Sequence, residues 1–268
     1  MTVYLKHFGL NEPPFSKEIE DTDLWLPPSK KALVDELVEA VEEHASVCLT
    51  GDPGVGKTSV LRALRSRLPQ AGFRLTYSHN ATLGRRDFYR QICLALGLTA
   101  PANAGCVFRA VTSYVEDLGR EHIHPVFLLD EAHLLQQAML EHLHVLLNYE
   151  WDRKALLSVF LVGLPELQDR LELRRNRSLY SRLHYRLAIE PHTPADTADY
   201  LQYRLRRAGV QTELFTSDTV AMLHETAFGS LRDIDRVATA ALKAASRRRR
   251  KLVERDTIES MLSTAHED

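Results

Sequence analysis

The segment 51–58 constrains the fold of this chain more than any other part of the sequence. It reads Gly-Asp-Pro-Gly-Val-Gly-Lys-Thr, which matches the pattern GxxxxGK[ST], and it lies between an apolar run at 47–50 and a helical pattern that starts at Val60. Glycines let backbone N–H groups turn inward around phosphate oxygens, and the helix that follows adds its positive N-terminal end. The segment therefore predicts a strand, a phosphate-binding loop and a helix in direct succession.

Each position of this loop receives an expected role from its geometry. Lys57 is expected to reach the β- and γ-phosphates, and the Thr58 hydroxyl is expected to hold Mg²⁺. ATP and Mg²⁺ are therefore the expected ligands. The residues expected to contact the nucleotide here are Gly51, Asp52, Pro53, Gly54, Val55, Gly56, Lys57, Thr58 and Ser59.

A second motif follows the apolar run at 126–129. Asp130, at the end of the expected strand, is placed to contact Mg²⁺ directly or through water. Glu131 is placed to orient and partly deprotonate the attacking water. With Ala132 and His133 the pair also spells a box of one helicase superfamily. The chain is too short for two helicase domains and has no second set of helicase motifs, so His133 is interpreted as a residue at a helix start.

Apolar runs and helical patterns alternate along the first two thirds of the chain. Alternation of this kind predicts an α/β fold of the phosphate-loop class, with a parallel sheet covered by helices on both faces. Ser29 is expected to cap the first long helix. Beyond residue 191 only helical patterns remain, which indicates a small helical lid domain. The expected strands are 47–50, 73–78, 126–129, 156–162 and 185–189, and the expected lid helices are 194–208, 217–227, 231–247 and 255–264. The expected domains are an extended N-terminal segment at 1–28, a nucleotide-binding domain at 29–191 and the lid at 192–268.

Composition excludes several classes of protein. The chain has 268 residues, a net charge of −2 and 44% hydrophobic residues, and no apolar run approaches the roughly 20 residues that cross a bilayer. Three cysteines are too few and too scattered for a disulfide framework or a zinc site. A cytoplasmic protein without a membrane segment is expected. The arginines at 170–186 and the five bases at 247–251 leave room for a local basic surface.

On these motifs the chain resembles the AAA+ ATPases, and specifically the ExeA-like branch that includes transposition helpers of the TnsC, TniB and MuB type. The resemblance covers nearly the whole chain. Segments 8–10 and 13–15 look like the branch's N-terminal signature, which lies beside the adenine. Segment 163–167 is similar to its G-x-P-E-L sequence, 181–183 to the part that carries an arginine finger, and 229–232 to the lid motif called sensor 2.

The resemblance implies further roles. Arg182 is expected to be the finger that reaches a neighbouring subunit's γ-phosphate, with Arg186 and Arg177 as alternatives, so that hydrolysis depends on assembly of a homo-oligomer. Arg232 is expected to touch the nucleotide from the lid. Asn80 is expected to hold Glu131 in an inactive rotamer until a partner or DNA arrives.

One departure from the family pattern concerns the end of the fourth strand. Many AAA+ proteins place a polar sensor there, aimed at the attacking water. Segment 161–164 reads Leu-Val-Gly-Leu and offers no hydrophilic side chain. Hydrolysis is therefore expected to be slow or to use another group.

The resemblance favours a DNA-mobilisation helper that forms a ring or filament on double-stranded DNA and recruits a transposase or an adaptor protein. Arg85 and Arg86 stand where such relatives line the DNA channel, and their contacts with phosphate would be independent of sequence. The alternative is a secretion-assembly ATPase like ExeA, but such proteins carry a membrane span and a cell-wall-binding region that this sequence does not show. A signalling switch related to origin-recognition and STAND ATPases would need an attached sensor or effector domain.

Overall fold

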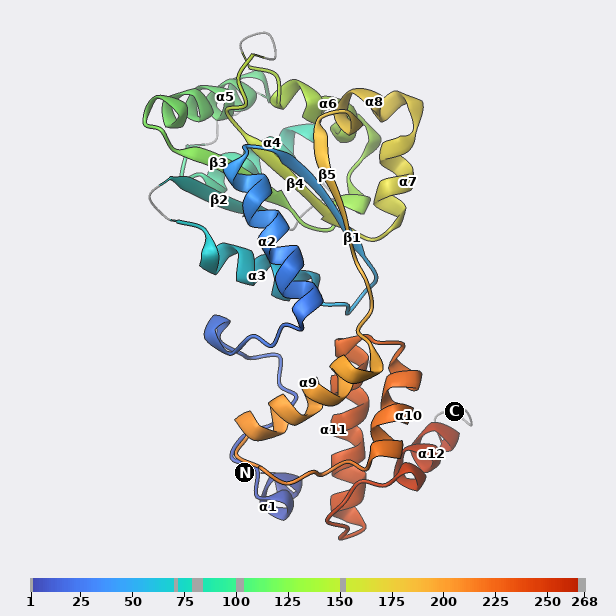
Figure 1. Cartoon of the computed structure of the whole chain (residues 1–268). Helices are drawn as coiled ribbons and strands as arrows, with labels where there is room; N and C mark the ends of the chain where they lie inside the picture. Colours follow the sequence, from blue (N-terminus) through green and yellow to red (C-terminus); the bar gives the residue numbers. More distant parts are fainter. Residues whose placement is uncertain (1, 70–71, 79–83, 100–103, 150–152, 265–268) are drawn as a thin grey trace. The chain divides into compact units, whose positions relative to one another are not determined.

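The computed structural model describes residues 2–69, 72–78, 84–99, 104–149 and 153–264 (Figure 1). The chain divides into two compact units. The sheet unit comprises Pro28–Asp52 and Lys57–Ile189. The helical unit comprises Met1–Pro27, Pro53–Gly56 and Glu190–Asp268.

The sheet unit is built on a five-stranded sheet of order β2-β3-β4-β1-β5. Every pairing in it is parallel, which confirms the predicted sheet. All residues of β1, β3 and β4 are buried, whereas the edge strands β2 and β5 are partly exposed. Strands covered on both faces need a nearly continuous apolar sequence, which is what the central strands have. The strands are β1 (Ser46–Gly51), β2 (Phe73–Ser78), β3 (His124–Leu129), β4 (Ser158–Gly163) and β5 (Leu183–Ile189).

Helices cover both faces of this sheet (Figure 1). On one face, α4 and α5 pack with apolar residues of β3 and β4 in a single core that also takes in α6, α7 and α8. Helix α2 contacts β1, β5 and α3. It begins at Pro28, so Ser29 lies inside its first turn and the predicted cap at Ser29 is wrong. The helices are α2 (Pro28–Glu42), α3 (Lys57–Arg67), α4 (Arg85–Ala95), α5 (Ala104–Arg120), α6 (Gln137–Leu146), α7 (Glu166–Glu172) and α8 (Arg177–Tyr180).

The helical unit packs four C-terminal helices around its own apolar core. Thr193 and Asp196 form a capping box at the start of α9, with Pro194 in the first turn, and Thr216 and Ser230 cap α10 and α11. These signals explain why the helices begin where the sequence predicts. The helices are α9 (Pro194–Arg207), α10 (Ser217–Ala227), α11 (Leu231–Arg247) and α12 (Arg255–Thr264).

The N-terminal segment belongs to the same core. The sequence predicts an extended segment here, but part of it is helical. Residues Val3–Phe8 form helix α1, whose Tyr4, Leu5 and Phe8 are buried with residues of α9 and α11. Arg204 of α9 fixes the following segment: its Nε donates to the Pro14 carbonyl at 2.6 Å and its Nη2 to the Ser16 carbonyl at 2.5 Å. A buried guanidinium that satisfies backbone carbonyls holds an irregular segment in one conformation.

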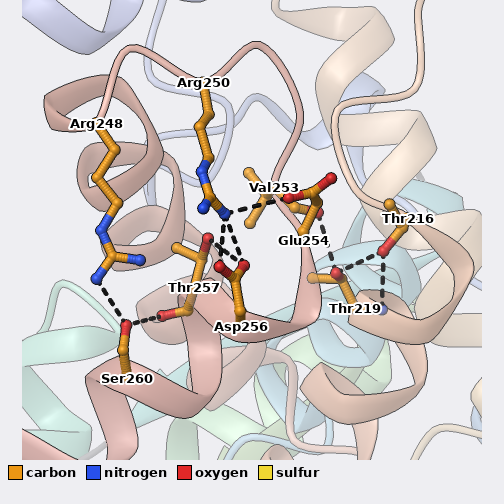
Figure 2. Close-up of polar contacts among 9 residues, drawn as sticks. All are labelled: Thr216, Thr219, Arg248, Arg250, Val253, Glu254, Asp256, Thr257 and Ser260. Atoms are coloured by element: carbon orange, nitrogen blue, oxygen red, sulfur yellow. Dashed lines mark hydrogen bonds and ion pairs between the residues drawn. The ribbon is translucent and has the colours of Figure 1, made fainter.

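The basic run at 247–251 is tied to its own unit (Figure 2). Arg250 contacts Asp256 at 2.7 Å and Glu254 at 3.1 Å, and Arg248 donates to the Ser260 hydroxyl at 3.0 Å. Lys251 donates to the His7 carbonyl at 2.8 Å. Three of the five bases therefore join α11 to α12 and to α1.

Within the described residues, no helix is long and apolar enough to cross a membrane. Cys48, Cys93 and Cys106 are free thiols, the first two of them buried.

Candidate nucleotide site

The phosphate loop connects the buried strand β1 to the first turn of α3, as the sequence predicts. Gly54 and Gly56 have φ angles of +83° and +100°, a region that residues with a side chain rarely adopt. The Lys57 ammonium group donates to the carbonyls of Gly51 at 2.6 Å and Asp52 at 2.9 Å. Thr58 is exposed on the first turn of α3. The Lys57 ammonium group therefore bonds to the backbone at the start of its own loop. Its charge lies beside the N-terminal end of α3.

The middle of the loop, Pro53–Gly56, groups with the helical unit. The Leu231 N–H donates to the Gly54 carbonyl at 3.0 Å. A methyl group added at Gly54 would collide with the Ser230 hydroxyl and would lie 3.2 Å from Cβ of Arg232. Arg232 is exposed and lies beside the loop, so the segment 229–232 is in contact with the loop backbone.

Asp130 follows β3 at the same edge of the sheet at which β1 and β4 end. Its Oδ2 accepts a hydrogen bond from the Tyr77 hydroxyl at 2.7 Å, and its Oδ1 accepts one from the Glu131 N–H at 2.9 Å. Burial raises the pKa of Tyr77, and the hydrogen bond to Asp130 raises it further. Tyr77 therefore stays a neutral donor that fixes the Asp130 carboxylate.

Sequence reasoning did not single out Tyr77. Its only signal is that it stands next to last in an expected strand. The pairing of Tyr77 with Leu128 in the β2–β3 register brings it level with the end of β3. This neighbour becomes visible only when the register is known.

Glu131 lies directly behind Asp130 with an unusual backbone. Its φ and ψ angles are 54° and 33°, in the left-handed region, which costs a residue with a side chain on the order of 1 kcal/mol. Its side chain is about half exposed, and Oε2 lies 3.6 Å from Nδ1 of His133. That separation is too long for a hydrogen bond. The bent backbone turns the chain away from β3 and into the short 3₁₀ helix Ala132–Leu134.

The three arginines considered for the finger differ in their surroundings. Arg182 lies between α8 and β5, and its Nη1 donates to the Ser178 carbonyl at 2.9 Å. Arg186 lies 3.9 Å above the Tyr180 ring and also donates to the Tyr180 carbonyl. Arg177 is exposed at the start of α8. Arg170, in the same basic segment, binds the His133 and Leu135 carbonyls and is a structural residue.

Two predicted contributors cannot be placed. Asn80 and the Arg85 side chain lie outside the described residues. Arg86 is exposed in the first turn of α4.

A family model described as "AAA domain" matches residues 38–171. General secretion pathway protein A of Aeromonas hydrophila is 33% identical over 252 residues, which cover 91% of this chain and 45% of that protein. The chain thus spans less than half of this relative's length.

Solved structures agree on the fold. Cdc6p of Pyrobaculum aerophilum superposes with a TM-score of 0.67 at 17% identity, covering 88% of this chain and 68% of the other. The Drosophila ORC bound to DNA superposes with a TM-score of 0.72 at 19% identity, covering 97% of this chain and 65% of the other. At these identities the likeness shows the fold alone.

The predicted AAA+ class and its ExeA-like branch are confirmed, whereas the relation to transposition helpers stays a prediction. Because the family model matches half of the chain and includes both the phosphate loop and the acidic pair, the chain belongs to the AAA-domain family.

Proposed function

We propose that this chain binds ATP with Mg²⁺ and hydrolyses it to ADP and phosphate. The observation that carries the proposal is the position of two motifs at one edge of one sheet: the phosphate loop follows β1, and Asp130–Glu131 follows β3. In open α/β sheets, ligands bind at the carboxyl ends of the strands.

The residues at this edge fit the ligand. Backbone N–H groups of the glycine-rich loop and the first turn of α3 suit phosphate oxygens. The Thr58 hydroxyl and the Asp130 carboxylate are hard oxygen donors of the kind that Mg²⁺ takes alongside phosphates and waters. When bound, Mg²⁺ would draw charge from the phosphates. Lys57 would move from the Gly51 and Asp52 carbonyls to the phosphates, and Glu131 would orient and deprotonate the attacking water.

Regulation by assembly is part of the proposal. Arg182 would supply positive charge to a neighbouring subunit's γ-phosphate, with Arg186 and Arg177 as the alternatives. Arg232 would contact the nucleotide, so that its position would change with the nucleotide state. The hydrogen bond from the neighbouring Leu231 N–H to the Gly54 carbonyl supports this role. Asn80 would restrain Glu131 until a partner arrives. The protein would then serve as a switch in a ring or filament.

The first candidate for the switch's target is double-stranded DNA, with recruitment of a transposase or an adaptor protein in the cytoplasm. Arg86 is exposed at the start of α4, where it could neutralise a phosphate together with Arg85. The Drosophila ORC of the same fold is bound to DNA.

A second candidate is the ATPase part of a secretion-assembly protein. The observation in its favour is the 33% identity to general secretion pathway protein A over 91% of this chain. The two candidates differ in whether DNA is a ligand. Duplex DNA of random sequence should bind in the presence of an ATP analogue, with an affinity that falls steeply with salt, and the variant Arg86→Ala should weaken it. No binding at low salt would favour the secretion role.

Lys57→Ala tests the ATPase itself. We expect nucleotide affinity to fall by at least about 10-fold and hydrolysis to be lost, because a charge-assisted contact of this kind contributes about 1.5–3 kcal/mol and about 1.4 kcal/mol is tenfold in affinity. Binding of a fluorescent ATP analogue and release of phosphate would be measured. Lys31→Ala, at an exposed position of α2, is the matched control. Unchanged binding and hydrolysis in Lys57→Ala would refute the proposal.

A further inference from the structure

β4 ends at a glycine, and the space that a side chain would take at this position is occupied by a residue from another part of the chain. Gly163 ends the strand next to β1 and β3. A methyl group added at Gly163 would lie 3.1 Å from the His133 backbone nitrogen and 3.2 Å from its Nδ1. The His133 side chain thus occupies the space into which a side chain at 163 would project. It is only 14% exposed.

The His133 ring lies close to Glu131 and to the backbone that follows β4. Its Nδ1 lies 3.6 Å from Oε2 of Glu131 and 3.4 Å from the backbone nitrogen of Leu164. Nδ1 accepts the Leu164 N–H, and the Glu131 carboxylate lies within ion-pair distance of the same atom without a hydrogen bond to it. The imidazole is therefore a polar group that lies beside both the end of β4 and the Glu131 carboxylate.

The backbone that carries His133 is held firmly. Arg170 donates one guanidinium nitrogen to the His133 carbonyl and another to the Leu135 carbonyl, the latter at 2.6 Å. Asn176, which is buried, donates to the Arg170 carbonyl at 2.7 Å and accepts from Gln137 at 2.6 Å. A side chain on a braced backbone loses little freedom when it orients another group, which is the condition for a positioning role.

We propose that His133 positions Glu131 and supplies, from the segment after β3, the polar group that is absent at the end of β4. The proposal rests on the proposed ATP hydrolysis with Glu131 as the base. The imidazole limits the rotamers of Glu131 and keeps its carboxylate beside the end of β4, where the attacking water would stand. It departs from the interpretation of His133 as a mere helix-start residue.

Two substitutions separate polarity from packing. Asn at position 133 retains a polar atom close to the place of Nδ1, whereas Phe retains the ring volume without a nitrogen. We expect His133→Phe to lower kcat by roughly 10- to 100-fold, because the base is no longer aligned, and we expect KM and the affinity for ATP analogue to change by less than about 3-fold. His133→Asn should recover most of the kcat. His122→Asn, at an exposed histidine before β3, should leave kcat unchanged.

A double variant tests the coupling to Glu131. Glu131→Gln alone should remove nearly all hydrolysis, and adding His133→Phe should then cost nothing further, because residues that act as a unit are not additive. The inference is overturned if His133→Phe keeps wild-type kcat, if Asn is as poor as Phe, or if both lose nucleotide affinity in proportion. A wild-type protein that binds ATP but never hydrolyses it would instead overturn the proposed function, and this inference with it.

Discussion

At the scale of single residues, Glu131 is one of several described non-glycine residues with a left-handed backbone, and it lies directly after Asp130 at the candidate site. Its φ of 54° and ψ of 33° take the backbone out of the extended conformation of β3. Such strain persists where function selects for it. The residue that is expected to activate water therefore lowers the stability of the fold that holds it.

This strain gives a testable trade-off. Glu131→Gly is expected to raise the free energy of unfolding by up to about 1 kcal/mol while abolishing hydrolysis, since glycine adopts this backbone without strain. Urea denaturation and phosphate release would measure the two effects. Glu131→Gln is the matched control, because it also loses hydrolysis but keeps the strained backbone. A Glu131→Gly protein less stable than Glu131→Gln would contradict the strain argument.

At the scale of elements, α9 and α11 are joined by a buried polar chain. Arg204 donates to the Tyr200 hydroxyl at 2.7 Å, and this hydroxyl donates to Asp235 at 2.6 Å. Burial raises the pKa of Asp235 to about 6, although the hydrogen bond from Tyr200 and the charge of Arg204 act to lower it. Because the raised pKa favours the neutral acid in the folded state, its contribution to stability is full below about pH 4 and is lost as pH rises to about 6.

The variant Asp235→Asn isolates this contribution, since asparagine does not titrate. The free energy of unfolding of the wild type minus that of the variant should fall by roughly 1–3 kcal/mol between pH 4 and pH 7. Chemical denaturation at a series of pH values would show it. A difference that is constant over this range, or that grows with pH, would contradict the assigned direction.

Elements that could be predicted from the sequence are those that leave a long local pattern. The buried strands have continuous apolar runs, and α9 and α11 are long and well capped. Helices α1, α7 and α8 were missed because they span six, seven and four residues, too few for a helical period to show.

In the candidate site, too, the residues in local motifs could be predicted and the long-range contacts could not. Lys57, Thr58, Asp130 and Glu131 belong to motifs that are local in sequence. The bond from Tyr77 to Asp130 joins residues 53 positions apart. The approach of His133 to Gly163 likewise depends on the β3–β4 register. Neither contact could be derived before the strands were paired.

At the scale of the whole molecule, the proposed finger makes hydrolysis a property of the assembly. Arg182→Ala should reduce hydrolysis by about 10³-fold or more while nucleotide affinity stays within about 3-fold, because the charge acts on the neighbour's transition state. Sedimentation with an ATP analogue would show whether the variant still assembles. Arg175→Ala, at an exposed position of the same basic segment, is the control.

Mixing variants makes this prediction sharper. Arg182→Ala and Lys57→Ala subunits are each inactive, but mixed oligomers contain interfaces where an intact loop meets an intact finger. Hydrolysis should therefore return in part on mixing. No recovery, or a wild type that stays monomeric with every nucleotide and with DNA, would contradict assembly-dependent hydrolysis. A loss of nucleotide affinity in Arg182→Ala would assign this arginine a structural role through its bond to Ser178.

The position of β1 between β4 and β5 also has a consequence for how the chain folds. Its partners β4 and β5 come late in the sequence, and the bond from the Val159 N–H to the Ser46 hydroxyl spans 113 residues. Pairings of such long separation require large loops to close first, so they form slowly. During synthesis β1 therefore emerges long before either neighbour exists, and both of its hydrogen-bonding edges can be paired only after residue 189 has left the ribosome.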